Sequence, residues 1–281
     1  MRGRPRSAGG GRRAPAAAIA ALLVLSPLAG SAEASATVAL VIDDLGYDRG
    51  AARRALALPP PVAVAVLPGA PHARSIARAA RRAGTDVLVH LPLHGSAAAE
   101  ESAALHAGMA DERLRQGVRA ALDAVPGAIG LNNHQGSAFT ADLGAMRAVM
   151  DVLAARSRPL LFIDSRTTAA TRAEAAARLA GVPVARRHVF LDHHRGADAI
   201  AAAVRDWLAR ARRDGCALAI GHPRPQTLRV LERLLPRADD VDRVGLRTYI
   251  ERCGRNAPGG NQWQASSSPL PKARKSSRRS R

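Results

Sequence analysis

Short apolar runs alternate with amphipathic segments from residue 36 onwards, and this alternation predicts the secondary structure. Seven runs are short and apolar enough to be buried strands: Val38–Ile42, Val62–Leu67, Asp86–Leu91, Ala128–Asn132, Leu160–Asp164, Pro183–Leu191 and Ala217–Gly221. Six segments repeat apolar residues at helical spacing: Pro71–Ala83, Asp111–Val125, Thr140–Ala155, Ala170–Ala180, Ala197–Arg213 and Pro225–Leu235. Such alternation predicts one α/β domain over residues 35–250, with a parallel sheet, open or closed into a barrel, and helices outside.

Nearly every predicted strand ends in an Asp or a His, and the carboxyl ends of parallel strands meet on one face of the fold. The first strand delivers two adjacent carboxylates, Asp43 and Asp44. Neighbouring residues of a strand point in different directions, so one carboxylate can hold a cation while the other handles a proton. Taken alone, the pair is more typical of a strand that ends in an Asx turn.

Asp and His side chains are suited to Zn²⁺ and similar divalent metals, and a catalytic zinc site commonly has three protein ligands. Asp44, His90 and His134 would supply that set from three strand ends. One His after a strand is usually a core or surface residue, but histidines recur here at successive strand ends. The segment 132–137 adds amides and a Gly-Ser turn around His134, so Asn132 or Asn133 is expected to orient a metal-bound imidazole.

The net charge of +19 over 281 residues is concentrated in the ends of the chain. The first 36 residues contribute a net four positive charges and residues 255–281 contribute seven, which leaves +8 for the domain. Few aromatic residues and no recognition motif argue against a nucleic-acid partner. Residues 251–281 lack apolar periodicity and are predicted to be a disordered basic tail.

Residues 1–34 resemble a secretory signal peptide, with basic residues, a short apolar core and a small-residue cleavage site at 32–34. The apolar core is shorter than the roughly 20 residues that span a bilayer, so the protein is not expected to be transmembrane after signal cleavage; an uncleaved anchor is the alternative. We therefore expect a periplasmic or secreted protein. Cys216 and Cys253 could pair in an oxidising compartment, but the apolar run after Cys216 favours a small core residue.

A set of motifs resembles the divergent polysaccharide deacetylase family: Ile42-Asp-Asp-Leu-Gly46, His90-Leu-Pro-Leu93, Asn132-Asn-His-Gln-Gly-Ser137, Phe162-Ile-Asp-Ser-Arg-Thr167, Phe190-Leu-Asp192 and Ile220-Gly-His-Pro223. The resemblance covers residues 38–235 and implies a distorted (β/α) barrel, here with about seven parallel strands in a single domain. The family usually has an acidic residue where this chain has His94, and Met where it has Gln135.

The resemblance also implies roles: a catalytic base at Asp43, a metal ligand at Asp44, and a late acid at His222 that protonates the leaving amine. Asp164 and Arg166 could orient Asp43 or His222, or form a structural ion pair. A third group, Asp192 to His194, could be a rim or a second metal site, although a solvated loop is favoured.

The expected function is an exported hydrolase that uses a divalent metal, Zn²⁺ by preference, to deacetylate an N-acetylated envelope polysaccharide. The alternative is a catalytically silent envelope protein of the same fold that binds glycan or a protein partner.

Overall fold

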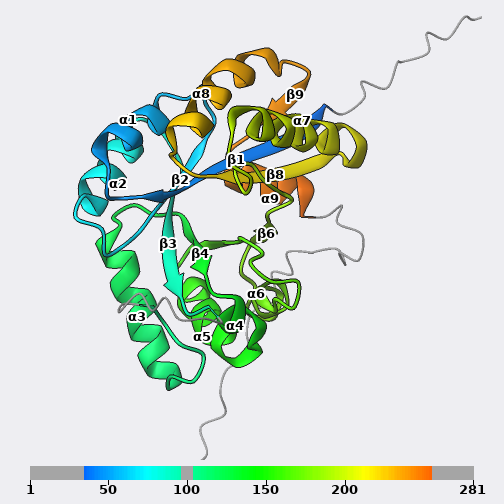
Figure 1. Ribbon diagram of the computed structural model, residues 1–281. Helices are drawn as coiled ribbons and strands as arrows, with labels where there is room; N and C mark the ends of the chain where they lie inside the picture. Colours follow the sequence, from blue (N-terminus) through cyan, green and yellow to red (C-terminus); the bar gives the residue numbers. More distant parts are fainter. Residues whose placement is uncertain (1–34, 96–103, 255–281) are drawn as a thin grey trace, which may run out of the picture. The chain divides into compact units, whose positions relative to one another are not determined.

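A computed structural model describes residues 35–95 and 104–254 (Figure 1). The predicted signal peptide, residues 1–34, and residues 255–281 of the predicted tail lie outside the described residues. Within the described ranges, no helix combines the length and the hydropathy that a bilayer span requires.

All strand pairs in the described sheet are parallel, which confirms the predicted α/β class. The strands are β1 (Ala36–Leu45), β2 (Ala63–Val66), β3 (Val87–Leu93), β4 (Gly130–Gln135), β5 (Leu161–Asp164), β6 (Val184–Arg186), β7 (Val189–Phe190), β8 (Cys216–Gly221) and β9 (Val241–Arg243). Eight of them follow the order β6-β5-β4-β3-β2-β1-β8-β7, and β9 pairs with the first residues of β1. The sheet curls into a half-barrel, in agreement with the distorted barrel that the family resemblance implies.

The predicted strand Pro183–Leu191 is in fact two strands, β6 and β7, at opposite edges of this order. Only Arg187 and His188 connect them, and the three steps from Arg186 to Val189 span at most about 10 Å, so the two edges lie close to each other at this link. The Arg187 side chain contacts both sides of the link: its Nε donates to the Ser165 carbonyl at 2.7 Å and its Nη2 to the Arg166 carbonyl at 2.9 Å, after β5, and its guanidinium lies 4.9 Å from the ring centre of Phe190 on β7.

All the described helices except α9 cover the outer face of the sheet. The helices are α1 (Arg49–Leu56), α2 (Ala73–Arg82), α3 (Asp111–Ala124), α4 (Ser137–Ala141), α5 (Leu143–Ala154), α6 (Ala173–Ala180), α7 (Ala197–Asp214), α8 (Pro225–Leu234), the 3₁₀ turn η1 (Leu235–Arg237) and α9 (Leu246–Cys253). The predicted helix Thr140–Ala155 breaks at Asp142, whose carboxylate caps α5 by accepting from the Ala145 N–H at 2.9 Å.

Helix α9 differs from the others because it packs against the inner face of the half-barrel. Its residues Leu246 and Tyr249 join the inner apolar cluster formed by alternate strand residues such as Val41, Leu88 and Ile220. The Asp86 carboxylate, just before β3, accepts from the Leu246 N–H at 2.8 Å. Helix α9 therefore fills the half-barrel at the amino-terminal end of the strands, opposite the face where chemistry was predicted.

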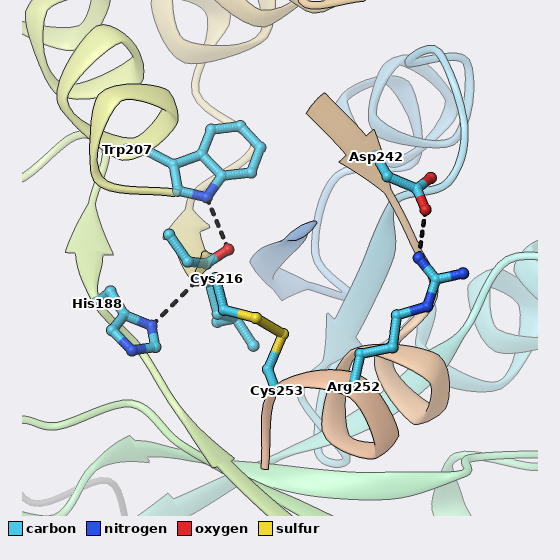
Figure 2. The surroundings of a disulfide bond; sticks show 8 residues. His188, Trp207, Cys216, Asp242, Arg252 and Cys253 are labelled. Carbon is cyan, nitrogen blue, oxygen red and sulfur yellow. Dashed lines mark hydrogen bonds and ion pairs between the residues drawn. A yellow bond between two sulfur atoms is a disulfide. The ribbon is translucent and has the colours of Figure 1, made fainter. Parts of the chain in front are cut away.

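Cys216 and Cys253 form a disulfide, which corrects the expectation of a small core residue (Figure 2). The apolar run after Cys216 predicts a strand, which is β8, but no sequence pattern predicts α9, so the sequence does not indicate that Cys253 lies next to Cys216. In the structure the bond ties the first residue of β8 to the last turn of α9. An ion pair between Arg252 and Asp242 also holds α9, here against β9 (Figure 2).

Breaking this disulfide is expected to lower the free energy of unfolding by about 3–4 kcal/mol, because it closes a loop of 37 residues in the unfolded chain. Urea unfolding with and without dithiothreitol measures the loss. The Cys216→Ala/Cys253→Ala double variant is the control, and its midpoint should not respond to the reductant. An unchanged wild-type midpoint under reducing conditions would contradict the assignment.

His188 is expected to make stability depend on pH. Its Nδ1 accepts from the Leu218 N–H at 3.0 Å, which requires a neutral ring, and burial with the nearby cation of Arg186 lowers the pKa of His188 to about 4. The unfolded chain takes up this proton near pH 6.5, so stability is full above that pH and falls as the pH drops towards 4. Allowing for partial exposure, the loss is about 1–3 kcal/mol.

The His188→Asn variant isolates this effect, because an amide oxygen can accept from Leu218 without titrating. Urea unfolding at pH 7 and pH 4.5, in EDTA, should show an additional loss in the wild type that the variant lacks. Parallel losses in the two proteins would rule His188 out as the titrating group.

Candidate metal centre

The inner face of the half-barrel changes from apolar to polar along each strand. Leu88 on β3 and Ile220 on β8 belong to the inner apolar cluster, and the next inward positions are His90 and His222. On β1 the same alternation carries Val41 on to Asp43. The strand pattern therefore places the predicted side chains on one face, at the carboxyl-terminal end opposite α9.

Asp44 joins this group through a local distortion of β1. In a regular strand it would point away from Asp43, but Asp44 has a φ of +56° and the register of β1 shifts between Ile42 and Leu45. A positive φ is uncommon for a residue other than Gly, although Asp tolerates it better than most. Such strain is concentrated at functional sites, and here it turns two successive carboxylates to the same side.

Three of the predicted ligand atoms form a nearly equilateral triangle. The Asp44 Oδ1 atom lies 3.1 Å from His90 Nε2 and 3.1 Å from His134 Nδ1, and the two ring nitrogens are 3.0 Å apart. Two vertices of a tetrahedron with metal–ligand bonds of about 2.0–2.1 Å are about 3.3 Å apart. The triangle is therefore of the right size for three ligands of a tetrahedral metal ion, and these residues could hold one.

The chemistry of the donor set fits a cation as well. Asp44 Oδ1 is buried and, among the described residues, has no hydrogen-bond donor placed to bond it, although two imidazole nitrogens lie 3.1 Å away. Burial would raise the pKa of Asp44, but His134 and His90 outweigh it and lower the pKa well below its usual range. A buried, ionised oxygen that lacks a hydrogen-bond donor is typical of a metal ligand.

Asn132 orients both His90 and Asp43. Its Nδ2 donates to Asp43 Oδ1 at 2.8 Å, which leaves its Oδ1 to accept from His90 Nδ1 at 2.9 Å. The proton of a neutral His90 therefore sits on Nδ1, and Nε2 presents a lone pair to the triangle. The sequence predicts this orienting role for Asn132 or Asn133. Asn133 instead joins β4 to the loop after β5 by accepting from the Ser165 N–H.

Asp43 is almost fully buried beside the triangle, with 3% of its surface exposed. Its Oδ2 lies 3.6 Å from His90 Nε2. Burial raises the pKa of the Asp43 carboxyl above its usual value, against the opposing effects of His90 and His222. A carboxylate with a raised pKa is a stronger base than an exposed one.

His222 approaches Asp44 from β8, with its Nε2 3.4 Å from Asp44 Oδ2. Its ring Nδ1 is 2.8 Å from Asp192 Oδ1. The other carboxylate oxygen, Asp192 Oδ2, accepts from the backbone N–H of His222 and from Thr227 Oγ1. Burial would lower the pKa of His222, but Asp192 and Asp44 outweigh it and raise the pKa. The ring is thus held with Nε2 directed at the centre.

The solvated loop expected at Asp192 is therefore wrong for that residue, which is 1% exposed, whereas His193 and His194 are exposed. Backbone pairing explains the difference. The Leu191 N–H donates to the Ile220 carbonyl, so the chain stays paired with β8 for one residue beyond β7 and Asp192 follows directly. The sequence does contain a signal for the burial of Asp192: it follows two apolar residues, Phe190 and Leu191, just as other site residues follow apolar strands.

Asp164 and Arg166 occupy the end of β5 without contacting Asp43 or His222. Asp164 is fully buried, and it accepts from the Arg166 N–H at 2.8 Å and from Thr171 Oγ1 at 2.9 Å. Burial raises the pKa of Asp164. These contacts hold the loop after β5, and the orienting contacts to Asp43 and His222 come from Asn132 and Asp192.

Comparison with known proteins identifies relatives of this chain. The sequence profile described as divergent polysaccharide deacetylase matches residues 40–248. The uncharacterized protein YibQ of Escherichia coli is 40% identical over 219 residues, 78% of this chain and 67% of the relative. An uncharacterized protein of Haemophilus influenzae is 38% identical over 217 residues, 76% of each chain.

Among solved structures, the uncharacterized protein ATU2773 of Agrobacterium tumefaciens has the same fold, with a TM-score of 0.72 at 23% identity over 78% of this chain and 90% of that one. The profile match spans most of the chain and includes every residue of the candidate centre. The chain belongs to the divergent polysaccharide deacetylase family.

Proposed function

We propose that this chain is an exported, metal-dependent hydrolase that removes N-acetyl groups from an envelope polysaccharide. The observation that carries the proposal is the triangle of Asp44, His90 and His134 with the buried carboxylate of Asp43 beside it. A divalent cation, Zn²⁺ by preference, would polarise the acetamide carbonyl and make a water molecule more acidic there.

The chain's own residues then divide the proton transfers. Asp43 takes the proton of the attacking water, which its raised pKa favours. His222 gives a proton from Nε2 to the leaving amine, while Asp192 holds the opposite ring nitrogen. The C–N bond breaks, and acetate and a free amine are released. Asn132 holds the Asp43 and His90 side chains in their positions during these steps.

Export is supported by the disulfide between Cys216 and Cys253, since such bonds persist in oxidising compartments. The basic start of the chain has the pattern of a signal peptide. A periplasmic protein would meet the envelope glycans that the proposal requires.

Acetate release from N-acetylated glycans tests the proposal. Purified protein loaded with Zn²⁺ should release acetate and free amine in equal amounts from chitotetraose or from N-acetylated envelope glycan. EDTA should abolish the release, and added Zn²⁺ should restore it. Folded, zinc-loaded protein that releases no acetate from any of these glycans would favour the silent glycan-binding or protein-binding alternative.

A further inference from the structure

A cavity of about 460 Å³ adjoins the candidate metal centre and shares Asp192 with it. The loop after β7 forms one part of its wall, through Asp192 and Arg195. The first turn of α8 and the residue before it form another part, from Arg224 to Thr227. The cavity is therefore open at the same carboxyl-terminal side of the sheet as the centre, and no role in the proposed deacetylation uses it.

The wall of the cavity is strongly basic. Three arginines line it, Arg195, Arg224 and Arg229, and the only carboxylate among the lining residues is Asp192. Asp192 is already engaged by His222 and Thr227. Within the described parts of the chain, no carboxylate lies within ion-pair distance of Arg195 or Arg229, and both residues are exposed, whereas Arg224 lies 3.9 Å from Asp192 Oδ2.

The start of α8 adds to this positive character. Helix α8 has ten residues and begins with Pro225, and no side chain in the described part of the chain caps its first N–H groups. The exposed N–H groups of a helix start favour negative charge, and guanidinium groups bind carboxylate and phosphate oxygens through paired hydrogen bonds. Arg195, Arg229 and the start of α8 thus line the same cavity.

We propose that this cavity is an anion-binding subsite for an acidic substituent of the glycan, a carboxylate or a phosphate. The inference rests on the proposed function, because it names the class of glycan that the centre would act on. Arg195 and Arg229 bind the acidic group. Arg224, which donates to the Asp192 carbonyl at 2.8 Å, joins the subsite to the residue that holds His222. A sugar unit beside the deacetylated one then carries the negative charge.

Binding by the full chain in EDTA tests the subsite, because chelation removes any metal that could itself bind the anion. Isothermal titration would compare chitotetraose, which is neutral, with a hyaluronan tetrasaccharide, which carries carboxylates, and with 6-phosphorylated chitotetraose. The wild type should bind at least one acidic probe about 10- to 100-fold more tightly than the neutral one. The acidic probe that binds more tightly identifies the group.

The Arg195→Gln/Arg229→Gln double variant should lose this preference and keep its affinity for chitotetraose. The matched control is Arg233→Gln, the same change one turn along α8 at an exposed position that does not line the cavity. Circular dichroism and the urea midpoint verify that the variants fold. Equal affinity of the wild type for acidic and neutral probes would overturn the subsite, as would an equal loss in Arg233→Gln.

The subsite and the catalytic proposal can fail separately. Acetate release from neutral glycan without any preference for acidic probes would overturn the subsite and leave the deacetylase intact. Arginine-dependent binding of an acidic glycan by a zinc-loaded protein that releases no acetate would support the subsite and overturn the deacetylase.

Discussion

The Asp44→Asn variant is expected to bind Zn²⁺ at least about 100-fold more weakly than the wild type and to lose acetate release with it. Replacing groups that only orient metal ligands already costs about 10- to 100-fold, and Asp44 supplies a ligand atom itself. Asn is nearly the same size and tolerates the positive φ of this position, so the backbone of β1 should be retained. Metal analysis after dialysis, and competition with a chromogenic chelator, measure the affinity.

Asp48→Asn is the control for this experiment. Asp48 is an exposed residue four positions further on, it caps α1 by accepting from the Gly50 N–H, and Asn caps helices equally well. The control should bind Zn²⁺ like the wild type. If Asp44→Asn is folded as well as the control and still binds one zinc ion per chain, the metal is held elsewhere and the triangle is not the site.

The sequence predicted the positions of the candidate side chains better than it predicted the edges of the fold. Strand periodicity predicts that Asp43, His90 and His222 lie on one face, as they do in the structure, because alternation decides the side of a sheet and parallel strands end on one face. The pair Asp43 and Asp44 required more than periodicity. Only the distorted backbone at Asp44 explains how two successive carboxylates reach the same centre.

The elements missed from the sequence have weak local signals. Helix α1 is short and built largely from Ala and Arg around Gly50, so its apolar stripe is thin. Helix α9 owes its position to long-range contacts, the disulfide and the cap from Asp86, which no local window contains. Asp192 was misjudged for a similar reason, since its burial depends on the pairing of Leu191 with Ile220.

The Asp43→Asn variant is expected to bind Zn²⁺ normally while its rate of acetate release falls by about 10²- to 10⁴-fold, the usual contribution of a general base. The amide oxygen can still accept from Asn132, so the orientation of His90 is kept. Because burial raises the pKa of Asp43, its ionised form destabilises the native protein at neutral pH. The variant should therefore unfold at a urea concentration equal to or higher than that of the wild type.

This combination separates a base from a structural residue. Loss of turnover with intact zinc binding and undiminished stability assigns the proton to Asp43, since a structural role would lower the urea midpoint as well. Full acetate release by Asp43→Asn would remove Asp43 from the reaction and leave Asp44 as the only carboxylate of the pair with a function. In that case the buried charge of Asp43 would lower the stability of the protein without contributing to turnover. We expect the opposite result, in which the buried carboxylate with a raised pKa lowers stability but accepts the proton of the attacking water.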